Sequence, residues 1–226
     1  MDGITSGASA SGVSVTIDRD KLAHVNTLLQ AFPDKALTIY ERAIRRGVSS
    51  GRRKAEDEIR QRYDIPLSSL RQDHSYYTFH ENVHRDAGGV VGQINFGGTA
   101  IPLYRFHPDP KTRRYTTRYV NGVSGWRITT EVSAADVKGN MIRHNTAFIA
   151  TFKSGHTGIF SRFDRTGREL GETGAGKAKI RELFGFNVRD MLAYEPARQA
   201  IEERMREIVE KRIDHELLRE LDTKMK

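Results

Sequence analysis

Cysteine is absent from this chain of 226 residues, so the sequence offers neither a disulfide framework nor a thiolate metal site. Long apolar runs are missing too, because no stretch approaches the roughly 20 residues needed to span a bilayer. The first twelve residues, MDGITSGASASG, lack the basic and apolar regions of a secretory signal. We therefore expect a soluble protein with no membrane contact, made in the cytoplasm.

Apolar content is also modest, since hydrophobic residues make up 37% of the chain and charged residues 29%. The chain is long enough to bury a core, but this balance favours an elongated or partner-supported shape. The formal net charge of +8 makes a polyanion the first partner to consider. Six of the basic residues cluster within thirteen positions, and two further arginines extend the row: Arg42, Arg45, Arg46, Arg52, Arg53 and Lys54, then Arg60 and Arg62.

Two long amphipathic helices are predicted. Between Asp34 and about Tyr63, apolar residues recur at three, four or seven positions. Gly47 and Gly51 interrupt this pattern, and each costs about 1 kcal/mol relative to alanine, so we expect a kink or a break there. The second helix covers 195–225, and its apolar stripe must be covered by the first helix or by a neighbouring subunit. Shorter helices are expected at 19–31 and 68–70, the first of them capped by Asp18.

The stretch Thr146–Phe163, TAFIATFKSGHTGIFSRF, predicts a β-hairpin. Two segments of alternating apolar residues flank a polar interval that contains two glycines. The period then changes, because Ile180, Leu183 and Phe184 have helical spacing and Gly185 stands where a helix would end. A short helix is therefore expected after the hairpin.

Further strands are predicted at four places: an edge strand at 13–17, a hairpin of 76–80 and 90–96, and a cleanly alternating strand at 126–132. The segment 107–125 has two prolines and little apolar content, which favours a projecting loop or β-arm. Its basic residues alternate with tyrosines that can stack on bases: Arg113, Arg114 and Arg118, with Tyr115 and Tyr119. The alternatives are contact with acidic surfaces of neighbouring subunits, or solubility alone.

Three possible chemical sites are weak. The segment 171–178 matches the G-x-x-x-x-G-K of a phosphate-binding loop, but Ala178 has no hydroxyl for magnesium, and a flexible connection is the better interpretation. His80 and His84 lie in a strand and loop, where a spacing of four does not bring two imidazoles together. His156 has no nearby aspartate, which favours a turn-stabilising hydrogen bond over catalysis. We expect no catalytic residue, cofactor or metal.

Several of these motifs together resemble the phage minor tail protein Z family, whose members are tail completion proteins. The motifs are FIATFKSGHTGIFSR, IRELFGFNVRDML, GGTAIPLYRF and RRKAEDEIRQRYDI. The likeness covers roughly residues 35–192, with 107–145 and the tail after Tyr194 covered least. The positions that carry it, with an expected structural role, are Phe148, Phe152, Ser154, Gly155, His156, Gly158, Phe160, Arg162, Ile180, Arg181, Leu183 and Gly185.

The fold class expected is α+β. A twisted, mostly antiparallel sheet or small β-sandwich is packed by a long N-terminal helix and flanked by a long C-terminal helix. The expected divisions are a flexible start at 1–12, a helical part at 13–72, a β-rich core at 73–192 with the arm at about 107–125, and the C-terminal helix at 193–226.

The resemblance implies a structural protein of the virion at the head-proximal end of the tail. Its partners would be the tail terminator, the tail tube, the neck or head connector and, by extension, the tape measure protein and phage DNA. A homo-oligomeric ring is expected, with six-fold symmetry as in tails generally. One alternative is a sequence-independent nucleic-acid-binding module, and another is an enzyme that uses Lys177 or His156.

Overall fold

A computed structural model describes residues 4–9, 12–18, 33–71, 75–86, 89–110, 115–120, 123–128, 132–135, 137–163, 166–167 and 179–224. The chain divides into two compact units built from separate stretches of sequence. Unit 1 comprises 1–59, 77–98 and 188–226, and unit 2 comprises 60–76 and 99–187. No helix in the described ranges is both long and apolar enough to cross a bilayer.

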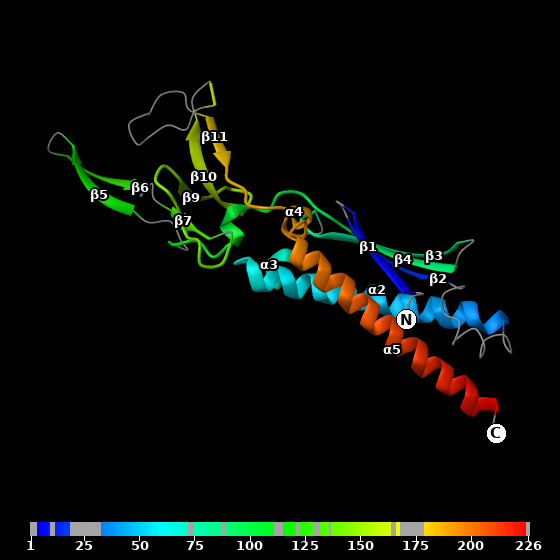
Figure 1. The fold of residues 1–226 in the computed structure, drawn as a ribbon. Helices are drawn as coiled ribbons and strands as arrows, with labels where there is room; N and C mark the ends of the chain where they lie inside the picture. The colour runs from blue at the N-terminus through cyan, green and yellow to red at the C-terminus, as the bar shows by residue number, and fades with distance from the viewer. Residues whose placement is uncertain are drawn as a thin grey trace. The chain divides into compact units, whose positions relative to one another are not determined.

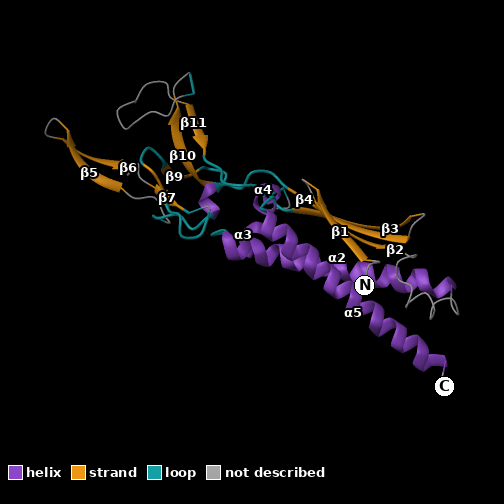
Figure 2. Cartoon of the chain, in the orientation of Figure 1, coloured by secondary structure: helices purple, strands orange, loops and turns teal. Residues whose placement is uncertain are grey.

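Unit 1 combines two long helices with a four-stranded antiparallel sheet, which confirms the α+β class (Figures 1 and 2). The helices are α2 (Pro33–Arg62, of which the last three residues belong to unit 2), the short α4 (Val188–Leu192) and α5 (Glu195–Lys224). The strands run in the order β1-β2-β4-β3. Their bounds are β1 Ile4–Ser9, β2 Gly12–Asp18, β3 Thr78–Asp86 and β4 Gly89–Gly97.

The predicted strand at 13–17 is present, but it is not an edge strand. β1 pairs with β2 from Ile4↔Ile17 to Ser9↔Gly12, and β2 pairs on its other side with β4. The sequence of β1 is poor in large apolar residues and was expected to be flexible. Backbone hydrogen bonds to β2 support this strand without requiring large side chains.

The two glycines of α2 do not break the helix, so the predicted break is wrong. α2 and α5 pack as an antiparallel pair, and the buried Gly47 and Gly51 of α2 face α5. A Cβ added at Gly47 would lie 2.5 Å from Val209 Cγ2, and one at Gly51 would lie 2.6 Å from Met205 Cγ. The glycines therefore allow close helix packing, and α2 covers the middle of the apolar stripe of α5, which also contacts β1 and β2.

Among its described residues, unit 2 contains short antiparallel sheets and no long helix of its own. The hairpin predicted at 146–163 is confirmed as β9 (Phe148–Thr151) and β10 (Thr157–Phe163). The short helix predicted after it is wrong, because β11 (Lys179–Glu182) pairs with β10 in a sheet of order β11-β10-β9. Pairing with β10 satisfies the backbone of this segment, whereas so short a helix would gain few internal hydrogen bonds.

Two smaller ribbons complete unit 2. The first pairs β5 (Tyr115–Val120) with β6 (Val123–Ile128), which makes part of the expected arm a hairpin. The second pairs β7 (Val132–Ala134) with β8 (Ile142–His144). The ends of the strand predicted at 126–132 lie in β6 and β7, which pair in different ribbons, and residues 129–131 lie outside the described residues. The turns α3 (Leu67–Arg71) and η1 (Leu103–Arg105) complete unit 2.

The core of unit 2 gathers around these sheets and turns. Its buried residues include Tyr63, Ile65, Leu70, Ile101, Phe106, Phe148, Ile149, Ile159 and Phe160. The predicted helix at 19–31 and the glycine-rich segment 171–178 lie outside the described residues.

Candidate basic site and signature hairpin

Part of the predicted basic cluster forms an open hollow in unit 1. Arg42, Arg45 and Arg46 lie at i, i+3 and i+4 on α2, and therefore on one side of the helix. Together with Ser49 and with Arg212 of α5, they line a hollow of about 420 Å³. Arg42 and Arg45 are largely exposed, with side chains 51% and 61% accessible. Four arginines from two helices thus line one opening.

A buried carboxylate of α5 holds part of this hollow in place. Glu216 is fully buried, and three arginines surround it. Its carboxylate oxygens lie 2.6 Å from Arg212, 3.6 Å from Arg42 and 3.7 Å from Arg219. Since a carboxylate is rarely buried without partners, these arginines stabilise Glu216, and Glu216 in turn restrains two of the arginines that line the hollow.

A second carboxylate, Glu41, lies on α2 with the three arginines. Arg45 donates to Glu41 Oε1 at 2.7 Å, and Arg85 of β3 donates to Oε2 at 3.2 Å. The hydrogen bond from Arg45, followed by that from Arg85, lowers the pKa of Glu41 below its ordinary value. Arg46 forms no ion pair with any carboxylate in the described part of the chain. Positive charge therefore remains in excess around the hollow.

The other half of the basic cluster is arranged differently. Arg52 stacks on Phe79 of β3 at 3.4 Å from the ring centroid, and its Nε lies 3.5 Å from the buried Glu56. Lys54 pairs with Glu58 at 2.7 Å. Arg53 and Lys54 line a second hollow of about 700 Å³. Its other lining residues are Ser50, Asp57, Ala200, Glu203, Arg204 and Glu207. Charge there is nearly balanced.

The arm at about 107–125 contains the remaining basic residues that were predicted to contact DNA or other subunits. Arg118 lies in β5 opposite Gly125 of β6, and its side chain is not described. Arg113 and Arg114 lie outside the described residues. Their proposed contacts with DNA or with other subunits therefore remain predictions.

The signature residues of the hairpin form an aromatic cluster in unit 2. Phe148 and Phe160 are buried with ring centroids 6.3 Å apart, and the guanidinium of Arg162 lies 4.7 Å from the Phe148 ring. Phe152 meets Phe160 edge to face at 4.9 Å while remaining 50% exposed. Arg181 of β11 lies over the ring of Phe163 at 5.3 Å. These contacts fix how the three strands pack.

Three signature glycines have distinct physical reasons. Gly155 has a φ of +87°, a left-handed conformation that allows the tight turn between β9 and β10, next to Ser154. A Cβ at Gly158 would lie 2.4 Å from Glu182 Oε1, and one at Gly185 would lie 2.8 Å from Phe106 Cε2. Gly185 therefore makes room for an aromatic ring and does not end a helix.

Two remaining signature positions lie in or beside β11. Leu183 joins two elements through its backbone, because its N–H donates to Ile159 at 2.8 Å and its carbonyl accepts from Leu103 at 2.9 Å. Ile180 lies opposite Arg162 and is 52% exposed. Leu183 thus holds the end of β11 in place through its backbone, while Ile180 leaves apolar surface exposed to solvent.

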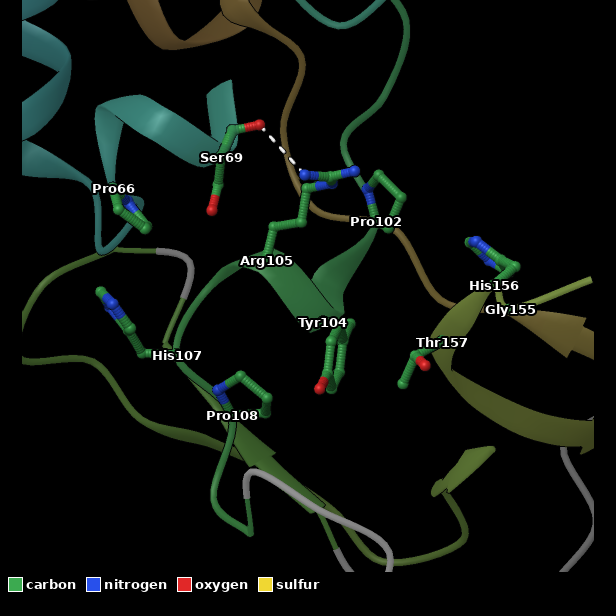
Figure 3. A pocket seen from close by; sticks show the side chains of 10 residues that line it. All are labelled: Pro66, Ser69, Pro102, Tyr104, Arg105, His107, Pro108, Gly155, His156 and Thr157. Atoms are coloured by element: carbon green, nitrogen blue, oxygen red, sulfur yellow. Dashed lines mark hydrogen bonds between the residues drawn. The ribbon is translucent and has the colours of Figure 1, made fainter. Parts of the chain in front are cut away.

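His156 lies at one wall of a cleft of about 460 Å³ in unit 2 (Figure 3). Its Nε2 is 2.9 Å from Glu182 Oε1, so the hydrogen bond ties the turn to β11. Across the cleft, His107 Nδ1 lies 2.8 Å from Asp64 Oδ1, and Tyr104 and Thr157 lie between the two histidines (Figure 3). Thr157 shares a hydroxyl hydrogen bond with Thr151 at 2.8 Å. Neither histidine hydrogen-bonds a serine or threonine hydroxyl within the described ranges.

The other histidine pair lies on β3, where His80 and His84 are both exposed. Groups of three or more histidine, aspartate or glutamate residues suited to a metal ion are not found in the part of the chain that the structure describes.

Sequence reasoning missed five residues that complete these sites: Glu41, Arg85, Glu182, Arg212 and Glu216. The spacing of Arg212 and Glu216, four apart on a predicted helix, was a usable signal for that pair. Glu41 and Arg45 have the same spacing on a predicted helix, so Glu41 also had a local signal. The contacts of Arg85 with Glu41 and of Glu182 with His156 join elements distant in sequence, and nothing local predicts them.

The structure is thus an α+β protein with a basic hollow in unit 1 and an aromatic hairpin in unit 2. Comparison with family models identifies the family, since the model for prophage minor tail protein Z (GPZ) matches residues 26–226. The chain therefore belongs to the prophage minor tail protein Z family. Comparisons with curated proteins and with solved structures give no match.

The family match changes the expected extent of the likeness. It includes the middle segment at 107–145 and the C-terminal helix, both expected to be covered least. It does not include residues 1–25, which contribute β1 and β2 to the sheet of unit 1. The family implies a structural component of the phage virion tail that associates with other tail proteins.

Proposed function

We propose that this protein completes the phage tail at its head-proximal end, where it joins the tail tube and terminator to the neck of the head. The observation that carries the proposal is the family match over 26–226. The role is structural and requires no turnover. Contact with the tape measure protein follows from the same position in the tail.

We also propose a homo-oligomeric ring, with six-fold symmetry. In a ring, each subunit presents one surface to the next in head-to-tail fashion. Support comes from the exposed apolar side chains of unit 2, which include Phe152, Ile180 and Phe184 at 50%, 52% and 51% exposure. Exposed aromatic and aliphatic side chains of this size are typical of protein interfaces.

The third part of the proposal is contact with the DNA that passes through the head–tail junction. Clustered arginines release counterions from the phosphate backbone without reading sequence. The hollow on α2 and α5 supports this contact, as does the net charge of +8.

The decisive experiment removes the gene from the phage and restores it on a plasmid. We expect the deletion to yield heads and tails that fail to form infectious particles, and complementation to restore infectivity. An electron-microscopy map of the junction should show density for the protein between tail and neck. Normal infectivity without the protein would refute the proposal.

A second candidate function is a nucleic-acid-binding module that acts outside the virion, and the arginine excess around the hollow favours it. This candidate predicts binding to DNA and absence from purified particles. Mass spectrometry of purified virions separates the two candidates, because a tail completion protein must be present.

A further inference from the structure

The arginines around the hollow outnumber the carboxylates that neutralise them. Glu216 alone is shared by Arg42, Arg212 and Arg219, and Glu41 is shared by Arg45 and Arg85. Arg46 has no partner among the described carboxylates. The balance of these groups is strongly positive in a small volume, and such a concentration of guanidinium groups attracts a compact polyanion.

We propose that this hollow is a phosphate-binding site for the backbone of double-stranded DNA, and that the buried Glu216 is the residue that positions its arginines. The inference rests on the proposed function for the source of the DNA, but the site itself is argued from geometry alone.

The spacing of the arginines suits a phosphate backbone. Arg42 and Arg46 are four residues apart, a rise of ~6 Å along α2. Two nucleotides of one DNA strand rise ~7 Å. Both arginines can therefore contact phosphates of the same strand. Arg212 enters from α5 across the hollow, and Ser49, one turn beyond Arg45, adds a hydroxyl donor.

Glu216 determines where two of these arginines point. An arginine side chain has many rotamers, and restraining it before the ligand arrives lowers the entropy lost on binding. Arg212 and Arg42 both form an ion pair with the buried carboxylate of Glu216. Loss of this carboxylate adds positive charge to the hollow but frees both side chains, so electrostatics and positioning predict opposite changes in affinity.

The test measures binding of the purified full chain to a short DNA duplex of arbitrary sequence by fluorescence anisotropy, as a function of salt. Arg46→Gln should lower the slope of log affinity against log salt by about 0.9, since one phosphate contact is lost. Between about 50 and 200 mM salt, the factor by which the variant loses affinity should therefore be about threefold smaller than the factor for wild type. The matched control is Arg206→Gln, an exposed arginine of α5 outside the hollow, which should leave the slope unchanged.

Glu216→Gln provides the sharper test of positioning. We expect affinity for the duplex to fall about threefold or more although the net charge rises, with circular dichroism confirming that the variant is folded at the temperature used. A rise in affinity would show general attraction without positioning and overturn that part of the proposal. Equal slopes for Arg46→Gln and wild type would overturn the site itself.

Two competitors identify the source of the ligand chemistry. Inorganic phosphate at matched ionic strength should displace little DNA, and full displacement would assign the hollow to a free phosphate ion. Poly-glutamate at equal charge should compete weakly, and equal competition would assign it to an acidic protein surface. Failure here leaves tail completion untouched, because the deletion phage tests that function without reference to DNA affinity.

Discussion

The contact between Gly47 of α2 and α5 allows a sharp prediction. In an exposed helix, replacing glycine by alanine stabilises by about 1 kcal/mol. At Gly47 the new Cβ would lie 2.5 Å from Val209 Cγ2 and 3.1 Å from the backbone oxygen of Met205. Because a backbone atom is involved, rotating one side chain does not relieve the clash. Gly47→Ala therefore requires α2 and α5 to separate.

The magnitude follows from two opposing terms. Overpacking a well-packed core costs about 1–3 kcal/mol, and a clash with helix backbone belongs in the upper part of that range. After the helix-propensity gain of about 1 kcal/mol is subtracted, Gly47→Ala should lower the free energy of unfolding by about 1–2 kcal/mol. Gly51→Ala is the matched control, since its Cβ would meet only the flexible side chains of Met205 and Ile201. That variant should lie within about 0.5 kcal/mol of wild type, because Met205 can change rotamer.

Urea unfolding followed by circular dichroism measures both variants, with the slope m checked for constancy. Val209→Ala should partly rescue Gly47→Ala, so that a double-mutant cycle gives a favourable coupling between the two positions. A Gly47→Ala variant more stable than wild type by about 1 kcal/mol would behave like an exposed helix position. That result would refute the close packing of α2 on α5.

Three further predictions concern single side chains. The hydrogen bonds of Arg45 and Arg85 lower the pKa of Glu41, so the stabilising contribution of this carboxylate is present above the usual pKa of 4.5 and is lost as pH falls through the lowered pKa. The melting temperatures of wild type and Glu41→Gln should therefore converge in acid, and a difference that stays constant with pH would contradict this. Arg52→Ala should lower the free energy of unfolding in urea by about 2 kcal/mol, because it removes the cation–π contact with Phe79 and leaves the buried Glu56 without that partner. A loss below about 0.5 kcal/mol would show that the Arg52–Glu56 pair is dispensable. Gly155→Ala should cost about 1 kcal/mol because of its left-handed φ of +87°, with Gly155→Asn costing less; equal stability of all three proteins would argue against a strained turn.

Local sequence patterns predicted the elements whose structure depends on local physics. The stripe of α2, the pattern of α5 and the alternation around the β9–β10 turn are each set by periodicity and turn chemistry. What the patterns missed depends on tertiary partners. Ile180 and Leu183 have helical spacing, yet β10 offers their segment a strand to pair with. β1 has almost no apolar signal, and it pairs with β2 through its backbone and also contacts α5, two partners that its own sequence does not indicate.

The candidate site shows the same division. The row of arginines on α2 was evident from sequence, but its separation into two functional halves was not. Arg52 and Arg42 both looked like solvent-facing cations, ten residues apart on one helix. The structure stacks Arg52 on Phe79 of β3 and leaves Arg42 at an open hollow. Charge counts along a sequence cannot distinguish cations used within the fold from cations left for a ligand.

This distinction makes the two groups of residues separable by experiment. The signature hairpin fixes aromatic packing in unit 2 through Phe148, Phe160 and the Gly158–Glu182 contact, so changes there should lower stability and incorporation into tails. The hollow of unit 1 carries charge on exposed side chains, so Arg46→Gln should lower DNA affinity while leaving stability nearly unchanged. A protein whose only task is to join subunits would need the first group and tolerate loss of the second. If hollow variants assemble into complete tails but deliver DNA poorly, the arginines act on the genome; if they fail to assemble, the hollow is an interface between proteins.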